Sequence, residues 1–520
     1  MIVTMPQPDS NHFEKSLTLE QKIGQVMVIG FDGITVDAEL RRLISEYHIG
    51  GVILFARNVQ SPQQVAALTK ELQKTALENG SPGLFIAIDQ EGGRVARLTE
   101  DKGFTEFPSA MAIGATADPE NAYRMASAMA AEMRAVGINV DFAPDLDVNN
   151  NPSNPVIGTR SFSSDPNKVA AFGAAFERGL QENGILAFGK HFPGHGDTGT
   201  DSHIALPIVP HDRARLNRIE FLPFKAAIAE NIAGIMSAHV TFPAIDSNPG
   251  LPATLSRSVL TGLLRDELGF QGLIATDSLE MGALAENGYP PPVGATLAFA
   301  AGADLLVFNR DHEMHQQAFT HLVQAVKEGK ISQEELDSSV RRILDTKEKF
   351  GILAPTLVAD SENGEHHALA LELAQKAITL LKDDDSLLPL KPAEPLLVIE
   401  TTAARGLGGL LKARTLEIEN DPDSDTITAA LGMALDGCKV IVTTTDTGFY
   451  AGQVKLVTEL LAKNRNVIIV SVRSPYDITF LPPVHTALAA YGGNMPTLQA
   501  IADVLMGKAE ASGVLPVTLS

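Results

Sequence analysis

The segment from Lys190 to His203, KHFPGHGDTGTDSH, brings ionisable residues and glycines together in a spacing that suits acid–base chemistry. Its proline and glycines interrupt any regular pattern, so the segment predicts a loop. An Asp two residues before a His, as in Asp201 and His203, can orient the imidazole and stabilise its protonated form. A histidine titrates near pH ~6.5 without burial. We therefore predict that His203 is a general acid and base, oriented by Asp201.

A second candidate for chemistry is Asp277, in the sequence GLIATDSLEMGA. It follows a short apolar run that predicts a buried strand, where a carboxylate has little structural purpose. One interpretation is an N-cap for a helix beginning at Ser278. The other is a nucleophile, because a carboxylate at the mouth of a barrel can attack an anomeric carbon and form a covalent glycosyl-enzyme. Asp277 and His203 would then supply the two halves of a displacement.

The elements that would position these residues alternate regularly along the first two-thirds of the chain. Strand-length apolar runs alternate about eight times with amphipathic segments of helical length, which is typical of a (β/α)8 barrel. An open, doubly wound sheet is the competing fold. The barrel is favoured because polar residues follow the predicted strands, where barrel enzymes place their active sites: Asp89, Glu91, Asp145, Asp147, Lys190, His191, His239, Asp277 and Asn309.

The chain is long enough for two domains. We predict a barrel over residues 1–352, a linker over 353–364 rich in polar and loop-forming residues, and a second α/β domain over 365–520. Four further apolar runs separated by helical segments make up this second unit.

Composition excludes several classes of function. The formal net charge of −22 argues against a nucleic-acid partner, which needs a basic surface. No uncharged apolar run approaches the ~20 residues that cross a bilayer, and the first residues do not read as a signal peptide. The single cysteine, Cys438, excludes an internal disulfide framework and fits a reducing compartment. We therefore expect a cytoplasmic protein with no membrane partner.

Four motifs together resemble glycoside hydrolase family 3: KHFPGHGDTGTDSH, the TDSLEM around Asp277, IDQEGGRVARL from Ile88, and FAPDLDV from Phe142. Within the family they are similar to the β-N-acetylhexosaminidase branch. That branch has an Asp-x-His pair, matched by Asp201 and His203. The family's β-glucosidases usually carry Trp after the nucleophile, whereas this chain has Ser278 there and no Trp. The ending from Tyr491 resembles the family's second domain, a three-layer α/β/α sandwich.

The resemblance implies a small carbohydrate substrate and a set of residues that bind the hydroxyls of the cleaved sugar: Asp89, Arg160, Lys190, His191 and His239. Carboxylates accept such bonds and ammonium groups donate them. It also implies a retaining exo-β-N-acetylglucosaminidase that acts on peptidoglycan fragments, as in peptidoglycan recycling, or on chitooligosaccharides.

Alternatives remain open at this point. They are a β-N-acetylglucosaminide phosphorylase, a β-glucosidase or β-xylosidase, and an inactive sugar-binding protein. Arg160 could also be a surface ion-pair residue. We expect no cofactor, and no metal, because prolines and glycines between His191 and His203 do not align the histidines as ligands. The oligomeric state is not predicted.

Overall fold

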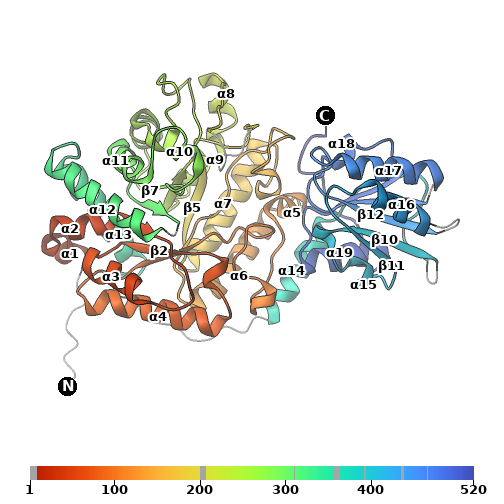
Figure 1. The fold of residues 1–520 in the computed structure, drawn as a ribbon, viewed down its shortest axis with the longest axis horizontal. Coiled ribbons are helices and arrows are strands. Elements are labelled where there is room, and N and C mark those ends of the chain that lie inside the picture. Colours follow the sequence, from red (N-terminus) through yellow and green to blue (C-terminus); the bar gives the residue numbers. More distant parts are fainter. Residues whose placement is uncertain are drawn as a thin grey trace.

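The computed structural model describes residues 9–199, 206–309, 311–354, 364–391, 394–434, 438–464 and 466–519. These residues form two parts, an eight-stranded sheet with surrounding helices and a separate six-stranded sheet (Figure 1). No helix in these ranges combines the length and the apolar character that crossing a bilayer demands.

The first sheet is parallel and closes on itself. Its strand order is β7-β6-β5-β4-β3-β2-β1-β8, and a parallel bridge between Ala275 and Leu305 joins the two ends. This closure confirms the predicted barrel and excludes the open sheet. The strands are β1 (Met27–Ile29), β2 (Gly51–Leu54), β3 (Phe85–Ile88), β4 (Val140–Asp141), β5 (Leu186–Phe192), β6 (Gly234–Ser237), β7 (Leu273–Thr276) and β8 (Leu306–Phe308).

Helices surround this barrel, and local signals explain where several begin. Ser61 and Asp165 each cap a helix whose first residue is proline, which has no N–H to satisfy at that position. The helical elements are α1 (Ser10–Ser16), α2 (Leu19–Gln25), α3 (Ala38–Tyr47), α4 (Pro62–Glu78), α5 (Ala110–Ala115), α6 (Glu120–Ala135), α7 (Pro166–Glu182), α8 (Arg213–Arg218), α9 (Phe221–Ala229), a π-helix (Ser258–Glu267), α10 (Gly282–Ala285), α11 (Pro291–Ala301), α12 (His312–Lys327) and α13 (Gln333–Lys349).

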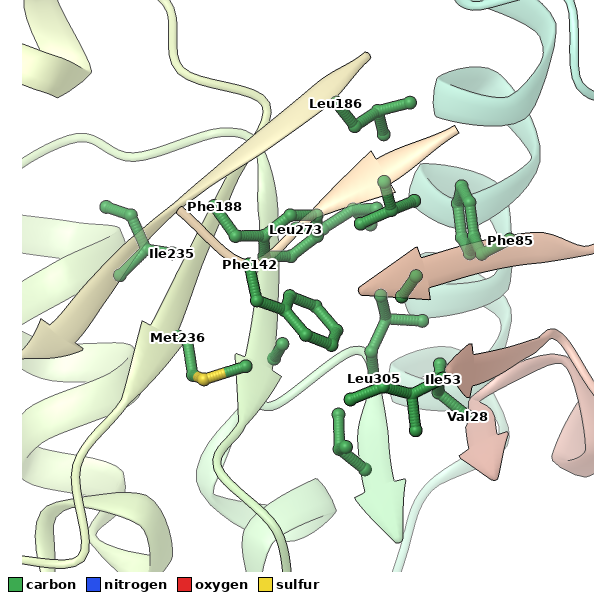
Figure 2. Close-up of a cluster of buried hydrophobic side chains, with 14 of the residues drawn as sticks. Val28, Ile53, Phe85, Phe142, Leu186, Phe188, Ile235, Met236, Leu273 and Leu305 are labelled. Carbon is green, nitrogen blue, oxygen red and sulfur yellow. The ribbon is translucent and has the colours of Figure 1, made fainter. Parts of the chain in front are cut away.

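The barrel interior is filled by apolar side chains from strands that are distant in sequence (Figure 2). Phe142, directly after β4, meets Phe188 of β5 edge to face, with ring centroids 5.3 Å apart. Both rings are buried, and burying one such side chain contributes about 1.5–3 kcal/mol. Ile53 and Met236 lie in the same cluster, which forms the apolar floor beneath the strand ends.

The second sheet has the order β11-β10-β12-β13-β14-β9, with β9 antiparallel to β14 and the other pairs parallel. Alternate strand residues pack on opposite faces: Val398 belongs to one apolar cluster, whereas Leu397 and Ile399 belong to another. Helices cover both faces (Figure 1), which confirms the three-layer α/β/α sandwich. Its elements are α14 (Gly364–Ala377), β9 (Thr379–Asp383), β10 (Leu396–Thr401), α15 (Leu407–Leu410), β11 (Arg414–Ile418), α16 (Ser424–Met433), β12 (Lys439–Thr444), α17 (Ala451–Lys463), β13 (Val467–Ser471), α18 (Asp477–Phe480), β14 (Thr486–Ala489) and α19 (Met495–Leu505).

The two parts are joined by apolar packing and hydrogen bonds. Met111 and Ala115 of α5 share a buried cluster with Tyr491 and Val517 of the second part. Ser109 donates a hydrogen bond from Oγ to the carbonyl of Tyr491 at 2.7 Å. The sandwich is therefore held against the barrel beside α5, where it can contribute to a site at the strand ends.

Two details differ from the sequence interpretation. Strand β5 runs through Phe192, so Lys190 and His191 lie within it instead of after it. The sequence analysis did not predict the edge strands β9 and β11. Their residues are largely exposed and include charged side chains, so they lack the continuous apolar run that is typical of a buried strand. Residues 355–363, most of the predicted linker, lie outside the described residues.

Candidate active site

A cavity of about 390 Å³ opens at the carboxyl ends of the barrel strands. It contains five of the predicted site residues, which come from β5 and from the segments that follow β3, β4 and β7: Asp89, Arg160, Lys190, His191 and Asp277. Ile53, Phe142 and Met236 form its apolar floor. Folding therefore brings the predicted nucleophile and four predicted sugar-binding residues into one cavity.

A buried carboxylate, Glu91, holds two of these cations together. Its oxygens accept from Arg160 at 2.7 and 2.8 Å and lie 2.7 Å from Nζ of Lys190. Lys190 also donates to Asp89 at 2.8 Å. Burial would raise the pKa of Glu91, but the charges of Arg160 and Lys190 outweigh it and hold this pKa well below its usual value. The site thus contains a fixed ionic cluster at the edge of the cavity.

His191 is oriented by this cluster and by the loop after β4. Its Nδ1 lies 2.7 Å from Oδ2 of Asp147, and its Nε2 lies 3.3 Å from the Arg160 guanidinium. Burial, with the charge of Arg160, lowers the pKa of His191 to about 4, so the ring is neutral near pH 7. Burial, with the neighbouring Asp147, raises the pKa of Asp145 to about 8. The neutral ring of His191 can therefore form hydrogen bonds near pH 7, but it carries no proton to donate as an acid.

Asp277 follows β7 and points into the cavity mouth. Its Oδ1 accepts from the backbone N–H of Ser278 at 2.7 Å. Burial raises the pKa of Asp277, but His239, His191 and this N–H together bring it below its ordinary value. The carboxylate is therefore ionised at neutral pH, as a nucleophile must be. Asp277 is not a helix N-cap, because the next helix, α10, begins only at Gly282 and its N-cap residue is Met281.

His239 takes a different place from the one that the sequence suggested. It is 1% exposed, and it is not among the described residues that line the cavity. One ring nitrogen lies 2.8 Å from Oγ1 of Thr254 and the other 2.9 Å from the carbonyl of Ser278. Its position beneath the turn at 277–278 supports a role in holding the carboxylate instead of direct contact with a sugar.

The predicted acid–base pair, Asp201 and His203, lies outside the described residues. The stem that leads to it, from His195 to Thr198, is described and is firmly held. The side-chain amide of Asn154 donates to the carbonyls of His195 and Gly196 at 2.9 and 2.8 Å. Gly196 also approaches Val148 so closely that a Cβ atom would lie 1.8 Å from its carbonyl oxygen.

Within the part of the chain that the structure describes, two groups of side chains have ligand atoms close enough to hold a metal ion: Asp145, Asp147 and His191, and Asp197, His211 and Glu220. Each group already contacts an arginine. Arg160 lies 3.6 Å from Asp145, and Arg215 lies 2.9 Å from Asp197. In each group an arginine guanidinium therefore supplies the positive charge that a metal ion would otherwise supply to the carboxylates.

The sequence analysis did not assign a functional role to Glu91. Its position after the third strand was noted, yet nothing in the sequence indicates that it accepts bonds from two cations 69 and 99 residues further along. The available signal was its place in IDQEGGRV beside Asp89 at a strand end.

Two family models match most of the chain. Residues 18–346 match the glycosyl hydrolase family 3 N terminal domain, and residues 423–520 match the family's C-terminal domain. Beta-hexosaminidase A of Pseudoalteromonas piscicida is 37% identical over 552 residues, covering 94% of this chain and 92% of that protein.

Solved structures are similar over both domains. A family 3 β-N-acetylglucosaminidase from Paenibacillus sp. has a TM-score of 0.92 and 41% identity, covering 97% of this chain and 99% of that one. A β-glucoside phosphorylase, BglX, bound to 2FGlc has a TM-score of 0.84 and 25% identity, covering 98% and 96%.

Proposed function

Since the chain belongs to glycosyl hydrolase family 3 and is a glycoside hydrolase of the β-hexosaminidase type, we propose that it is a retaining exo-β-N-acetylglucosaminidase. The observation that carries the proposal is the convergence of Asp277 with Asp89, Arg160, Lys190 and His191 in one cavity. A volume of about 390 Å³ is near the lower end of small-molecule sites, about 300–1000 Å³, which favours one terminal sugar over a long chain.

In the proposed first step, a carboxylate oxygen of Asp277 forms a bond to the anomeric carbon while the bond to the leaving oxygen breaks. His203 donates its proton to that oxygen. In the second step His203 takes a proton from water, and the water oxygen attacks the anomeric carbon and displaces Asp277. The lowered pKa of Asp277 supports its role, because only the ionised form attacks.

The sugar would be held by side chains that the ionic cluster fixes in place. Asp89 can accept bonds from hydroxyls, while Lys190 and Arg160 can donate to hydroxyl oxygens. Because Glu91 and Asp89 hold both cations, little rotamer freedom remains to be lost when substrate binds. The terminal N-acetylglucosamine of a peptidoglycan fragment or chitooligosaccharide is the proposed substrate, and the cytoplasm is the proposed location.

Trapping with a 5-fluoro N-acetylglucosaminyl donor tests the nucleophile. Mass spectrometry should find the label on the peptide that contains Asp277, and Asp277→Ala should abolish turnover of p-nitrophenyl β-N-acetylglucosaminide. A label on another residue would refute the assignment.

His203 is tested by leaving-group dependence. His203→Ala should slow natural substrates more than activated aryl substrates, because a good leaving group needs little protonation. Equal losses on both would contradict its role as the acid.

A phosphorylase is the second candidate, favoured by the likeness to the β-glucoside phosphorylase and by a histidine acid, which does not repel phosphate as a carboxylate would. Formation of N-acetylglucosamine 1-phosphate in phosphate buffer would support it. A yield no higher than in a non-phosphate buffer would eliminate it.

A further inference from the structure

The walls of the active-site cavity differ in charge. Apart from Asp277, the ionisable side chains that line it within the described ranges come from β5 and from the segments after β3, β4 and β5. The strands β2, β1, β8 and β7 follow one another around the other side of the barrel. The lining residues on that side include four that we call the neutral wall: Phe55, Met281, Val307 and Asn309.

The neutral wall combines apolar side chains with one carboxamide. Val307 is buried in β8, while Phe55, directly after β2, and Met281, in the loop after β7, are half-buried. Asn309 stands directly after β8 and adds an uncharged polar group. Such a surface matches a group that is apolar at one end and forms a neutral hydrogen bond at the other.

Contacts on three sides fix Asn309. Its backbone N–H donates to Oε1 of Glu280 at 2.9 Å. Arg57 donates to its backbone carbonyl at 2.9 Å and to its side-chain oxygen at 3.2 Å. Because the amide oxygen faces Arg57, the amide nitrogen is at the opposite end of the group, and it has no partner among the residues that the structure describes. This nitrogen is therefore available to donate to a ligand.

Arg57 holds two members of the neutral wall at once. Its guanidinium lies over the ring of Phe55, 4.4 Å from the centroid, and also reaches Asn309. The guanidinium is itself fixed, since its Nε lies 3.0 Å from the carbonyl of Phe31 and 2.9 Å from Oδ1 of Asp32. The neutral wall is therefore organised before substrate binds, which reduces the entropy lost on binding.

The position of the nucleophile indicates which part of a sugar meets this wall. Asp277 follows β7, and Met281 belongs to the same loop. The anomeric carbon that Asp277 would attack is bonded to C2, so the C2 substituent lies close to the attacking carboxylate. Hydroxyls further round the ring can be bound by the charged side chains of the opposite wall. An acetamido group at C2 offers a carbonyl oxygen for Asn309 and a methyl group for the apolar side chains.

We propose that Asn309 recognises the 2-acetamido group of the substrate, with its Nδ2 donating to the acetamido carbonyl while the methyl group packs against Phe55, Met281 and Val307. Arg57 acts through these residues as a positioning residue. This inference rests on the glycosidase activity proposed above and deepens it, because it assigns the side chains that distinguish an N-acetylated aminosugar from a sugar with a hydroxyl or an ammonium group at C2.

The test compares three p-nitrophenyl β-glycosides that differ only at C2: the N-acetylglucosaminide, the glucoside and the glucosaminide, which carries an ammonium group. The first measured quantity is the ratio of kcat/KM for the N-acetylglucosaminide over the glucoside. Wild type should prefer the acetamido sugar by about a hundredfold or more. Inhibition constants of free N-acetylglucosamine and free glucose give the corresponding ratio for binding without turnover.

Two substitutions of Asn309 separate hydrogen bonding from shape. Asn309→Ala should lower both ratios about tenfold, as expected for the loss of one hydrogen bond to substrate. Asn309→Asp keeps the shape and the oxygen that Arg57 binds, but it has no amide donor, so it should lower them at least as much. The new carboxylate should also raise kcat/KM for the glucosaminide relative to the N-acetylglucosaminide severalfold, because it attracts an ammonium group.

Arg57 and a distant asparagine complete the set. Arg57→Met should lower the ratios severalfold, and Arg57→Lys should recover part of the loss, since an ammonium group still donates to the oxygens of Asn309. Asn79→Ala is the matched control. Asn79 ends α4, before β3 begins and so at the opposite face of the barrel, where its amide donates to the carbonyl of Thr75 at 2.7 Å. It should leave the ratios unchanged.

The two proposals fail differently. If wild type cleaves none of the three glycosides, the proposed function is wrong and this inference falls with it. If wild type cleaves the N-acetylglucosaminide but Asn309→Ala and Asn309→Asp leave the ratios within twofold of wild type, the activity stands and the role of Asn309 is refuted. An equal loss on the N-acetylglucosaminide and the glucoside also refutes it. Should Asn309→Ala unfold at the assay temperature, Asn309→Asp and the Arg57 pair decide by the same criteria.

Discussion

Replacing Glu91 with Gln tests whether the ionic cluster positions the active site. The carboxylate makes three short contacts to cations, at 2.7, 2.8 and 2.7 Å, and is 3% exposed. Each charge-assisted bond contributes about 1.5–3 kcal/mol, roughly 5–9 kcal/mol in all. An amide keeps one accepting oxygen, so we expect a net loss of about 3–5 kcal/mol, in line with other broken buried ion pairs.

The assays are kcat/KM on p-nitrophenyl β-N-acetylglucosaminide and the midpoint of thermal unfolding. Because Lys190 and Arg160 would shift, kcat/KM should fall by about 100-fold or more. Glu417→Gln is the control: Glu417 forms an exposed pair with Arg405 at 3.0 Å, and the loss there should stay below about 1 kcal/mol.

The pH dependence gives a second check on Glu91. Its pKa is below 4.5 in the folded state, so its stabilisation is fully present above pH 4.5 and is lost as the pH falls toward the folded value. The difference in unfolding midpoint between wild type and Glu91→Gln should therefore narrow below pH 4.5. Activity within about twofold of wild type, with an unchanged midpoint, would refute the role assigned to the cluster.

Three further outcomes are expected. Gly196→Ala should lower kcat/KM at least tenfold, because its Cβ would lie 1.8 Å from the carbonyl oxygen of Val148. Gly199→Ala should be neutral, because its Cβ would have no atom of the described residues within 4 Å, and equal activity of the two variants would contradict this reasoning. His239→Ala should lower kcat more than it raises KM for the aryl glycoside, since the ring supports the nucleophile's turn; a change confined to KM would instead indicate sugar contact. Lys347 is buried, and burial lowers its pKa from 10.5 to about 7. Between these two pH values the unfolded chain binds more protons than the folded chain, so the free energy of unfolding should rise with pH from about 7 to 10.5. Lys347→Met should flatten this pH dependence in urea unfolding, and an unchanged slope would exclude this lysine as its source.

The sequence by itself determined the barrel and most of the residues around its mouth. Parallel strands buried on both faces must be apolar along their whole length, so polar residues such as Asp89 and Asp277 stand out where a strand ends. Since all eight strands point the same way, their ends converge at one mouth whatever the loops do. Local patterns were less informative for β9 and β11, whose positions are set by backbone pairing at sheet edges.

Only the tertiary structure decided what individual side chains do at that mouth. Glu91 binds two cations because folding brings Arg160, from the segment after β4, and Lys190, from within β5, next to it. Such pairing depends on distances that the sequence pattern does not contain. His239 ends a strand like the others, yet packing turns its ring beneath Asp277. Arg473 of the second domain lines a small cavity together with Arg94 of the barrel because apolar packing at α5 docks that domain beside the barrel.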